Sequence, residues 1–189
     1  MLNRRSFILQ SRAVFAAATL GGSASAQEYF GKFVGEFDAR FNPDGRTVTL
    51  LSELSFFDPD NLQWTAPKGL VVDGASIPRP LWTIVGSPYT GGYRRASIIH
   101  DQFCNTKERT WRETHYVFYL ASRVDGVSEL YAKLLYGGVL RFGPRWEKNR
   151  NTGELIKTDP DLSQSEFDNL KDWILQENPS LKDINRRVL

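Results

Sequence analysis

The chain has 189 residues, with 24 lysines and arginines, 22 aspartates and glutamates and a formal net charge of +2. The first 26 residues contain three arginines and no acidic residue, so the remainder carries 21 basic and 22 acidic side chains. This balance excludes nucleic-acid binding driven by net positive charge. Residues 27–189 have the length of one domain with a single core, and the lone Cys104 excludes an intrachain disulfide.

The N-terminus predicts an export signal. Adjacent arginines, Arg4 and Arg5, precede a weakly apolar run at about residues 13–22, and residues 24–26 have the Ala-Ser-Ala form of a signal cleavage site. The apolar run is much shorter than the roughly 20 residues of a membrane-spanning helix. The paired arginines favour the twin-arginine route. We therefore expect a mature chain that begins at Gln27, has no transmembrane segment and is periplasmic or secreted.

Three extended segments open the predicted domain. Residues 33–39 alternate in polarity, residues 46–57 are rich in β-branched and aromatic types, and residues 62–72 form a third run that a Pro-Lys-Gly sequence interrupts. Turn sequences with Pro, Asp and Gly or Asn separate the runs, at residues 42–45 and 58–61. The pattern predicts a small N-terminal antiparallel sheet.

Helical periodicity follows. Tyr93, Ala96, His100 and Phe103 lie at i, i+3, i+7 and i+10, which predicts a helix with His100 on its buried stripe. Two more helices are expected, one at about 110–124 with Thr114, Val117, Phe118 and Ala121 inward, and one from Val127 to near Gly143 with a stripe of Val127, Leu130, Tyr131, Leu134 and Leu135.

The third helix contains Gly137-Gly138, which would weaken it unless another part of the chain packs closely there. Near the C-terminus, Ser163 and Glu166 fit a capping box, and Leu162 with Phe167 fits a hydrophobic staple. A short helix to about residue 176 is therefore expected. Strands followed by a three-helix cluster and this C-terminal helix predict an α+β fold.

The sequence between the last strand and the first helix concentrates polar groups in a rigid segment. Asp73 and Gly74 suit a turn, while prolines at 78 and 80 stiffen the exit. These roles leave Ser76 and Arg79 unexplained. We expect this segment to line one pocket with His100, and to place an Asp73 or Ser76 oxygen within about one water of its ring.

His100-Asp101 is the second concentration of polar groups. A histidine on a helix face can act as a general base when a partner fixes its tautomer. Adjacent helical residues diverge by about 100°, so Asp101 is free to hold a cation or an arginine. The alternative is a satisfied core histidine beside an aspartate paired with Arg94 or Arg95.

A divalent metal ion is the one cofactor left open. His100 and Cys104 lie four residues apart, and with His115 and Asp101 they offer nitrogen, sulfur and oxygen ligands to zinc. The spacing matches no standard zinc signature, and Cys104 equally suits a small buried position. Asp73, Asp101 and His115 are the candidate metal ligands.

Several short motifs together resemble a bacterial and phage family called domain of unknown function 1353: Trp64, Pro67–Gly69, Val72–Arg79, Gly92–Ala96 and His100-Asp101. The resemblance spans roughly residues 31–143 and leaves residues 144–189 as a C-terminal extension. It implies a small α+β domain without an established reaction. Two positions depart from the family: Cys104 replaces an aromatic residue, and His115 replaces an aspartate.

A second resemblance is to the helices of phospholipase A2. It implies that His100 activates water and Asp101 binds calcium, while His115 stands where that family has an aspartate that orients the histidine. The paired cysteines and the calcium loop of that family are absent from this sequence.

Two functional hypotheses remain. The first is a monomeric hydrolase of an envelope ester or amide, in lipid or cell wall. His100 would be its general base, with Asp73 as orienter or metal ligand and Asp101 as cation ligand. Arg79 would stabilise an anion, and Ser76 or water would be the nucleophile. The second is a non-catalytic envelope accessory or binding protein with a structural polar cluster. An open cleft at His100 supports the first hypothesis, and a sealed His100 supports the second.

Overall fold

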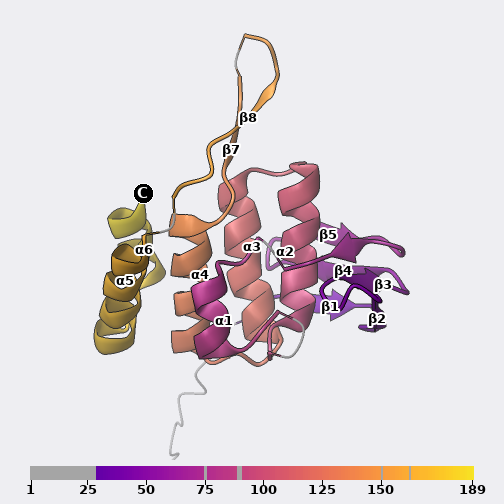
Figure 1. Cartoon of the computed structure of the whole chain (residues 1–189), viewed down its shortest axis with the longest axis horizontal. Coiled ribbons are helices and arrows are strands. Elements are labelled where there is room, and N and C mark those ends of the chain that lie inside the picture. Colours follow the sequence, from indigo (N-terminus) through magenta and orange to yellow (C-terminus); the bar gives the residue numbers. More distant parts are fainter. Residues whose placement is uncertain (1–28, 75, 89–90, 150, 162) are drawn as a thin grey trace, which may run out of the picture.

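The computed structural model describes residues 29–189 except 75, 89–90, 150 and 162. Strands from the N-terminal half form one side of the domain, and helices are layered outward from them (Figure 1). The strands are β1 (Lys32–Val34), β2 (Ala39–Phe41), β3 (Val48–Leu50), β4 (Leu54–Phe57), β5 (Gln63–Ala66), β6 (Val71–Val72), β7 (Trp146–Lys148) and β8 (Leu155–Lys157). The helices are α1 (Arg79–Val85), α2 (Arg94–Thr106), α3 (Trp111–Val124), α4 (Glu129–Phe142), α5 (Gln164–Glu177) and α6 (Leu181–Val188). The α+β class is confirmed.

The N-terminal strands form a three-stranded antiparallel meander that is broken across its middle. Each predicted extended run becomes two short strands, so these strands form two sheets in place of one, with orders β1-β4-β5 and β2-β3-β6, and β7 pairs with β8 in a separate hairpin. At the break Gly35 has φ +96°, and a Cβ there would lie 2.5 Å from the Glu53 carbonyl oxygen. The backbone needs this close approach to turn from one sheet into the other.

The helices α2 and α3 form where the periodicity predicts them. Thr110 caps α3 in a reciprocal box with Glu113, which satisfies donors that the first turn would leave unpaired. The predicted stripe of α2 is buried throughout, and so is the predicted face of α3. The two helices pack against each other and bring His100 opposite His115.

Helix α4 is enclosed on more sides than its predicted stripe requires. Tyr131 is 44% exposed, so its place in the buried stripe was wrong, while every residue from 132 to 140 is buried. A Cβ at Gly137 would lie 2.7 Å from Ile174 of α5, and one at Gly138 would lie 2.6 Å from Leu81 of α1. The two glycines therefore let α5 and α1 pack closely against α4. Such close packing is what the sequence required for a glycine pair within a helix.

Two helices were not expected from the sequence. Helix α1 begins directly after Pro78 and has a proline in its first turn, where the missing N–H costs nothing. Helix α6 begins after Ser180, whose side chain accepts the Asp183 N–H. The expected C-terminal helix is α5, and Ser163 caps it; Leu162 of the expected staple lies outside the described residues. Among the described residues, no helix is both long enough and apolar enough to span a membrane.

Candidate functional site

The segment after β6 meets helix α2 at Asp101. The Gly74 N–H donates to Asp101 Oδ2 at 3.0 Å, and the carboxyl group is almost completely buried. Gly74 has φ +66°, and a Cβ there would lie 2.6 Å from the Pro88 ring, so this position requires glycine. Burial raises the pKa of Asp101 to about 7, although Ser76 and the Gly74 N–H lower it. The two polar segments are therefore neighbours, and they meet at the hydrogen bond between Gly74 and Asp101.

Asp73 and Arg79 face a different side of the segment. Asp73 forms an ion pair with Arg46, and the Arg79 guanidinium lies 5.8 Å from the centre of the Trp82 ring. These four residues and Phe41 line one pocket of about 450 Å³. Arg46 and Trp82 were not among the predicted site residues. The pairing of β3 with β6 could have indicated Arg46. It places Val48 opposite Val72, so Arg46 and Asp73, just outside the two strands, come together.

Ser76 lines a second, smaller pocket. This pocket of about 180 Å³ is also lined by Cys104, Arg145 and Asp159. Ser76 is thus placed between Asp101 and Cys104, and its hydroxyl influences the pKa of both groups. The predicted site residues are therefore divided between two pockets and the core.

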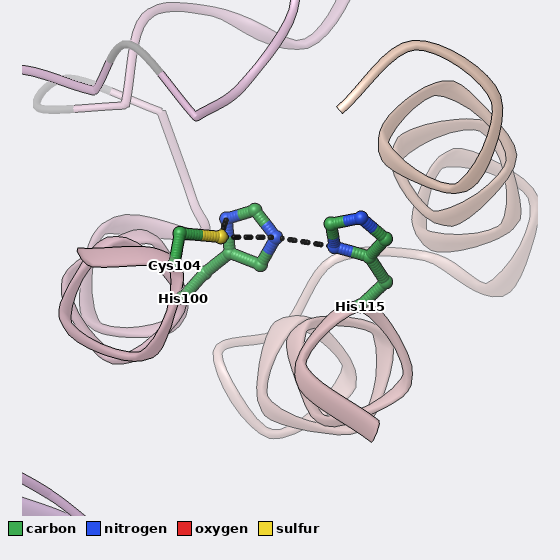
Figure 2. Close-up of side chains that lie close together, drawn as sticks. All are labelled: His100, Cys104 and His115. Atoms are coloured by element: carbon green, nitrogen blue, oxygen red, sulfur yellow. Dashed lines mark hydrogen bonds between the residues drawn. The ribbon is translucent and has the colours of Figure 1, made fainter. Parts of the chain in front are cut away.

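His100 lies in the core. It has no exposed surface, and its Nε2 is 2.9 Å from Nδ1 of His115, which is equally buried (Figure 2). The His100 ring packs against Phe118 at a tilt of 37°, with 4.7 Å between ring centres, and Cys104 Sγ lies 3.6 Å from His100 Nε2. A sealed imidazole pair is the arrangement that the non-catalytic hypothesis requires.

Burial sets the charge of this cluster. Desolvation lowers the pKa of His100 to about 3 and holds the pKa of His115 well below its ordinary value. The same cause raises the pKa of the Cys104 thiol. Near neutral pH both rings are therefore uncharged and the sulfur is protonated, because each charged form would lose its hydration.

The predicted arginine partners of Asp101 bind elsewhere. Arg95 Nε lies 2.6 Å from Asp125 Oδ1, and Arg94 lies over the ring of Phe37. The interpretation in which Asp101 pairs with Arg95 was wrong, because the α3–α4 turn supplies Asp125 to that arginine. Asp101 instead holds the backbone of the segment after β6.

Of the three candidate metal ligands, His115 has suitable partners in the structure. One ligand atom each from His100, Cys104 and His115 lie within 4.8 Å of one another. Asp73 and Asp101 are not part of this group, since Asp73 pairs with Arg46 and Asp101 holds Gly74. The histidines and the cysteine are a nitrogen–sulfur set, which suits a transition metal better than calcium.

The fold is that of a small α+β domain in which a broken meander packs on a helical bundle. The bundle encloses the two buried imidazoles. Residues 48–139 of the chain match the model of the family described as "Protein of unknown function (DUF1353)". This match confirms the resemblance seen in the sequence motifs, over a shorter span than residues 31–143.

Two relatives are uncharacterised proteins from Sinorhizobium fredii (strain NBRC 101917 / NGR234). The chain is 43% identical to protein y4jT over 143 residues, which is 73% of this chain and 43% of the relative. It is 42% identical to protein y4iH over 115 residues, which is 60% of this chain and 48% of the relative. The chain thus spans less than half the length of either relative. No solved structure is significantly similar.

Proposed function

We propose that the protein is an exported, non-catalytic binding domain of the cell envelope, and that its ligand occupies the pocket beside Asp73 and Arg79. The division of the predicted site supports this proposal. Asp73 and Arg79 line one pocket, Ser76 lines another, and His100 is sealed in the core. A general base, an anion stabiliser and a nucleophile that do not share a cavity cannot act on one bond.

The larger pocket has the composition of a recognition site. Trp82 and the exposed side chain of Phe41 line the pocket with aromatic rings, and Arg79 places a guanidinium beside the indole. The Arg46–Asp73 ion pair adds a fixed polar edge. Aromatic faces with a few placed polar groups are typical of small-molecule sites. The ligand that fits is a sugar that packs the C–H face of its ring on these side chains and carries a carboxylate, as in soluble fragments of peptidoglycan.

Removing the guanidinium should weaken this binding. Arg79→Ala is expected to raise the Kd for soluble peptidoglycan fragments at least tenfold, because a hydrogen bond to a charged group contributes about 1.5–3 kcal/mol. Isothermal titration calorimetry measures the change. Arg187→Ala is the matched control, since Arg187 also lies over a tryptophan, Trp173, away from this pocket. Equal loss in both variants, or unchanged binding by Arg79→Ala, would contradict the proposed site.

The hydrolase hypothesis is less well supported. Water and substrate would have to reach His100 through side chains that bury it completely. A pKa of about 3 also makes the neutral ring a weak base near pH 7. Asp101 has a pKa nearer the working range but is occupied by the Gly74 N–H.

Export remains a proposal that rests on the N-terminal sequence, which lies outside the described residues. Replacing Arg4-Arg5 by Lys-Lys should abolish export if the twin-arginine route is used. Cell fractionation and mass spectrometry of the exported chain check this, with Gln27 as the expected first residue. A lysine variant that is exported at the normal level would indicate the general secretory route, and a start upstream of residue 27 would contradict the cleavage site.

A further inference from the structure

We infer that His100, Cys104 and His115 form a buried site for one transition-metal ion, with Zn²⁺ as the best match. The site is separate from the pocket proposed for the envelope ligand, so a test that contradicts one proposal leaves the other unaffected. It joins two consecutive helices, since His100 and Cys104 are one turn apart on α2 and His115 is on α3 (Figure 2).

Two of the three spacings between ligand atoms are close to those of a tetrahedral site. Two nitrogens at about 2.0–2.1 Å and a sulfur at about 2.3 Å from zinc lie roughly 3.3 Å (N···N) and 3.6 Å (N···S) apart. His100 Nε2 and His115 Nδ1 are 2.9 Å apart, and His100 Nε2 is 3.6 Å from Cys104 Sγ. All three ligand atoms lie within 4.8 Å of one another, so the two rings separate slightly and Cys104 and His115 close around the ion when it binds.

The surroundings hold the ligands in place. The ring of Trp111 lies 5.6 Å and that of Trp146 6.5 Å from the His115 ring, measured between centres, so apolar groups enclose it. His115 Nε2 is buried and makes no hydrogen bond of ordinary geometry with the described residues, and the Pro144 carbonyl lies beside this ring. A carbonyl that accepts from Nε2 would leave the Nδ1 lone pair for the metal, because histidine ligands usually donate their other ring N–H to such an oxygen.

The smaller pocket supplies access to the site. Cys104 lines it with Ser76, Arg145 and Asp159, while both histidines are sealed behind the thiol. A metal with three protein ligands keeps one position for water or an anion, and the pocket reaches the cluster from the sulfur side.

Cobalt titration tests the site without knowledge of any ligand or activity. We expect the metal-free protein to bind one equivalent of Co²⁺ and to show visible d–d bands of tetrahedral intensity with a near-ultraviolet thiolate-to-cobalt band. Zn²⁺ should displace the cobalt and raise the Tm, and EDTA should reverse the rise. The absence of a thiolate-to-cobalt band in the wild-type protein would overturn the proposal whatever the variants do.

Three variants assign the ligands. Cys104→Ser should remove the thiolate-to-cobalt band, and His115→Gln should weaken Co²⁺ binding at least a hundredfold. Asp172→Asn is the matched control, since this carboxylate is exposed on α5, away from the cluster and from both pockets, and should leave the spectrum and the affinity unchanged. Circular dichroism shows whether each variant is folded. A folded Cys104→Ser or His115→Gln variant with the wild-type spectrum would contradict the assignment, as would loss of the spectrum in Asp172→Asn.

Discussion

His100→Ala should destabilise the metal-free protein by about 3–5 kcal/mol. The change removes a completely buried ring from its contact with Phe118 and leaves a cavity in the centre of the bundle. It also removes the partner that His115 Nδ1 meets at 2.9 Å, and an unpaired buried polar atom costs about 1–3 kcal/mol. Urea unfolding in EDTA measures the free energy of unfolding without any contribution from metal.

Tyr131→Ala provides the control for this measurement. Tyr131 is also a ring on a helix, but it is 44% exposed, so its removal should cost less than about 1 kcal/mol. A His100→Ala variant with the stability of the wild type would mean that the imidazole is not part of the core. It would then favour a catalytic histidine that is exposed in solution.

Local sequence patterns predict the meander and the main helices because each depends on residues close in the chain. The turn at 42–45 pairs β2 with β3, and the Thr110–Glu113 box starts α3. The break across the meander depends on how closely Gly35 approaches the Glu53 carbonyl, a contact between different strands. Such contacts are not encoded in the periodicity of one segment.

The orientation of α4 and the presence of α1 also could not be predicted from local patterns. Tyr131 fits an apolar stripe, but α5 and α6 pack against Gly137 and leave Tyr131 exposed. The hydrophobic periodicity of α4 does not indicate where helices later in the chain will pack. The prolines at 78 and 80 indicate a rigid corner, yet a proline also suits the first turn of a helix, so one pattern fits two structures.

For the candidate site, the sequence indicates which residues matter but not which of them meet. Asp73, Ser76 and Arg79 are close in the chain, but they line two different pockets because the segment turns at Gly74. His115 meets His100 because α2 and α3 pack as neighbours. Their separation of 15 residues has no standard motif, and only the packing of the helices brings the imidazoles together.

Acid should destabilise the metal-free protein through its two histidines. A group with a lowered pKa in the folded state binds fewer protons folded than unfolded, so stability falls as the pH drops below the unfolded value of about 6.5. This holds for His100, with a folded pKa of about 3, and for His115. For His100 the expected slope is about 1.4 kcal/mol per pH unit between roughly pH 4 and 6.5, and His115 adds a slope of the same sign.

Asp101 should oppose this trend. Its pKa is raised to about 7 from an ordinary value near 4, so it is protonated in the folded state and ionised in the unfolded state between those values. Its contribution to stability is therefore lost as the pH rises through this range. In a variant without the Asp101 carboxyl group, nothing should oppose the pH dependence that the two histidines give to the free energy of unfolding. In a variant without His115, the pH dependence from His100 should still be opposed by that from Asp101.

Urea unfolding between pH 4 and 6.5 in EDTA separates these effects through differences between variants. Asp101→Asn should steepen the dependence of unfolding free energy on pH by about 1.4 kcal/mol per unit, and His115→Gln should flatten it. Asp172→Asn is the control, because its carboxylate is exposed on α5, away from the buried cluster. Parallel curves for the wild type and His115→Gln would mean that His115 is hydrated in the folded state, and the buried cluster would not exist in solution.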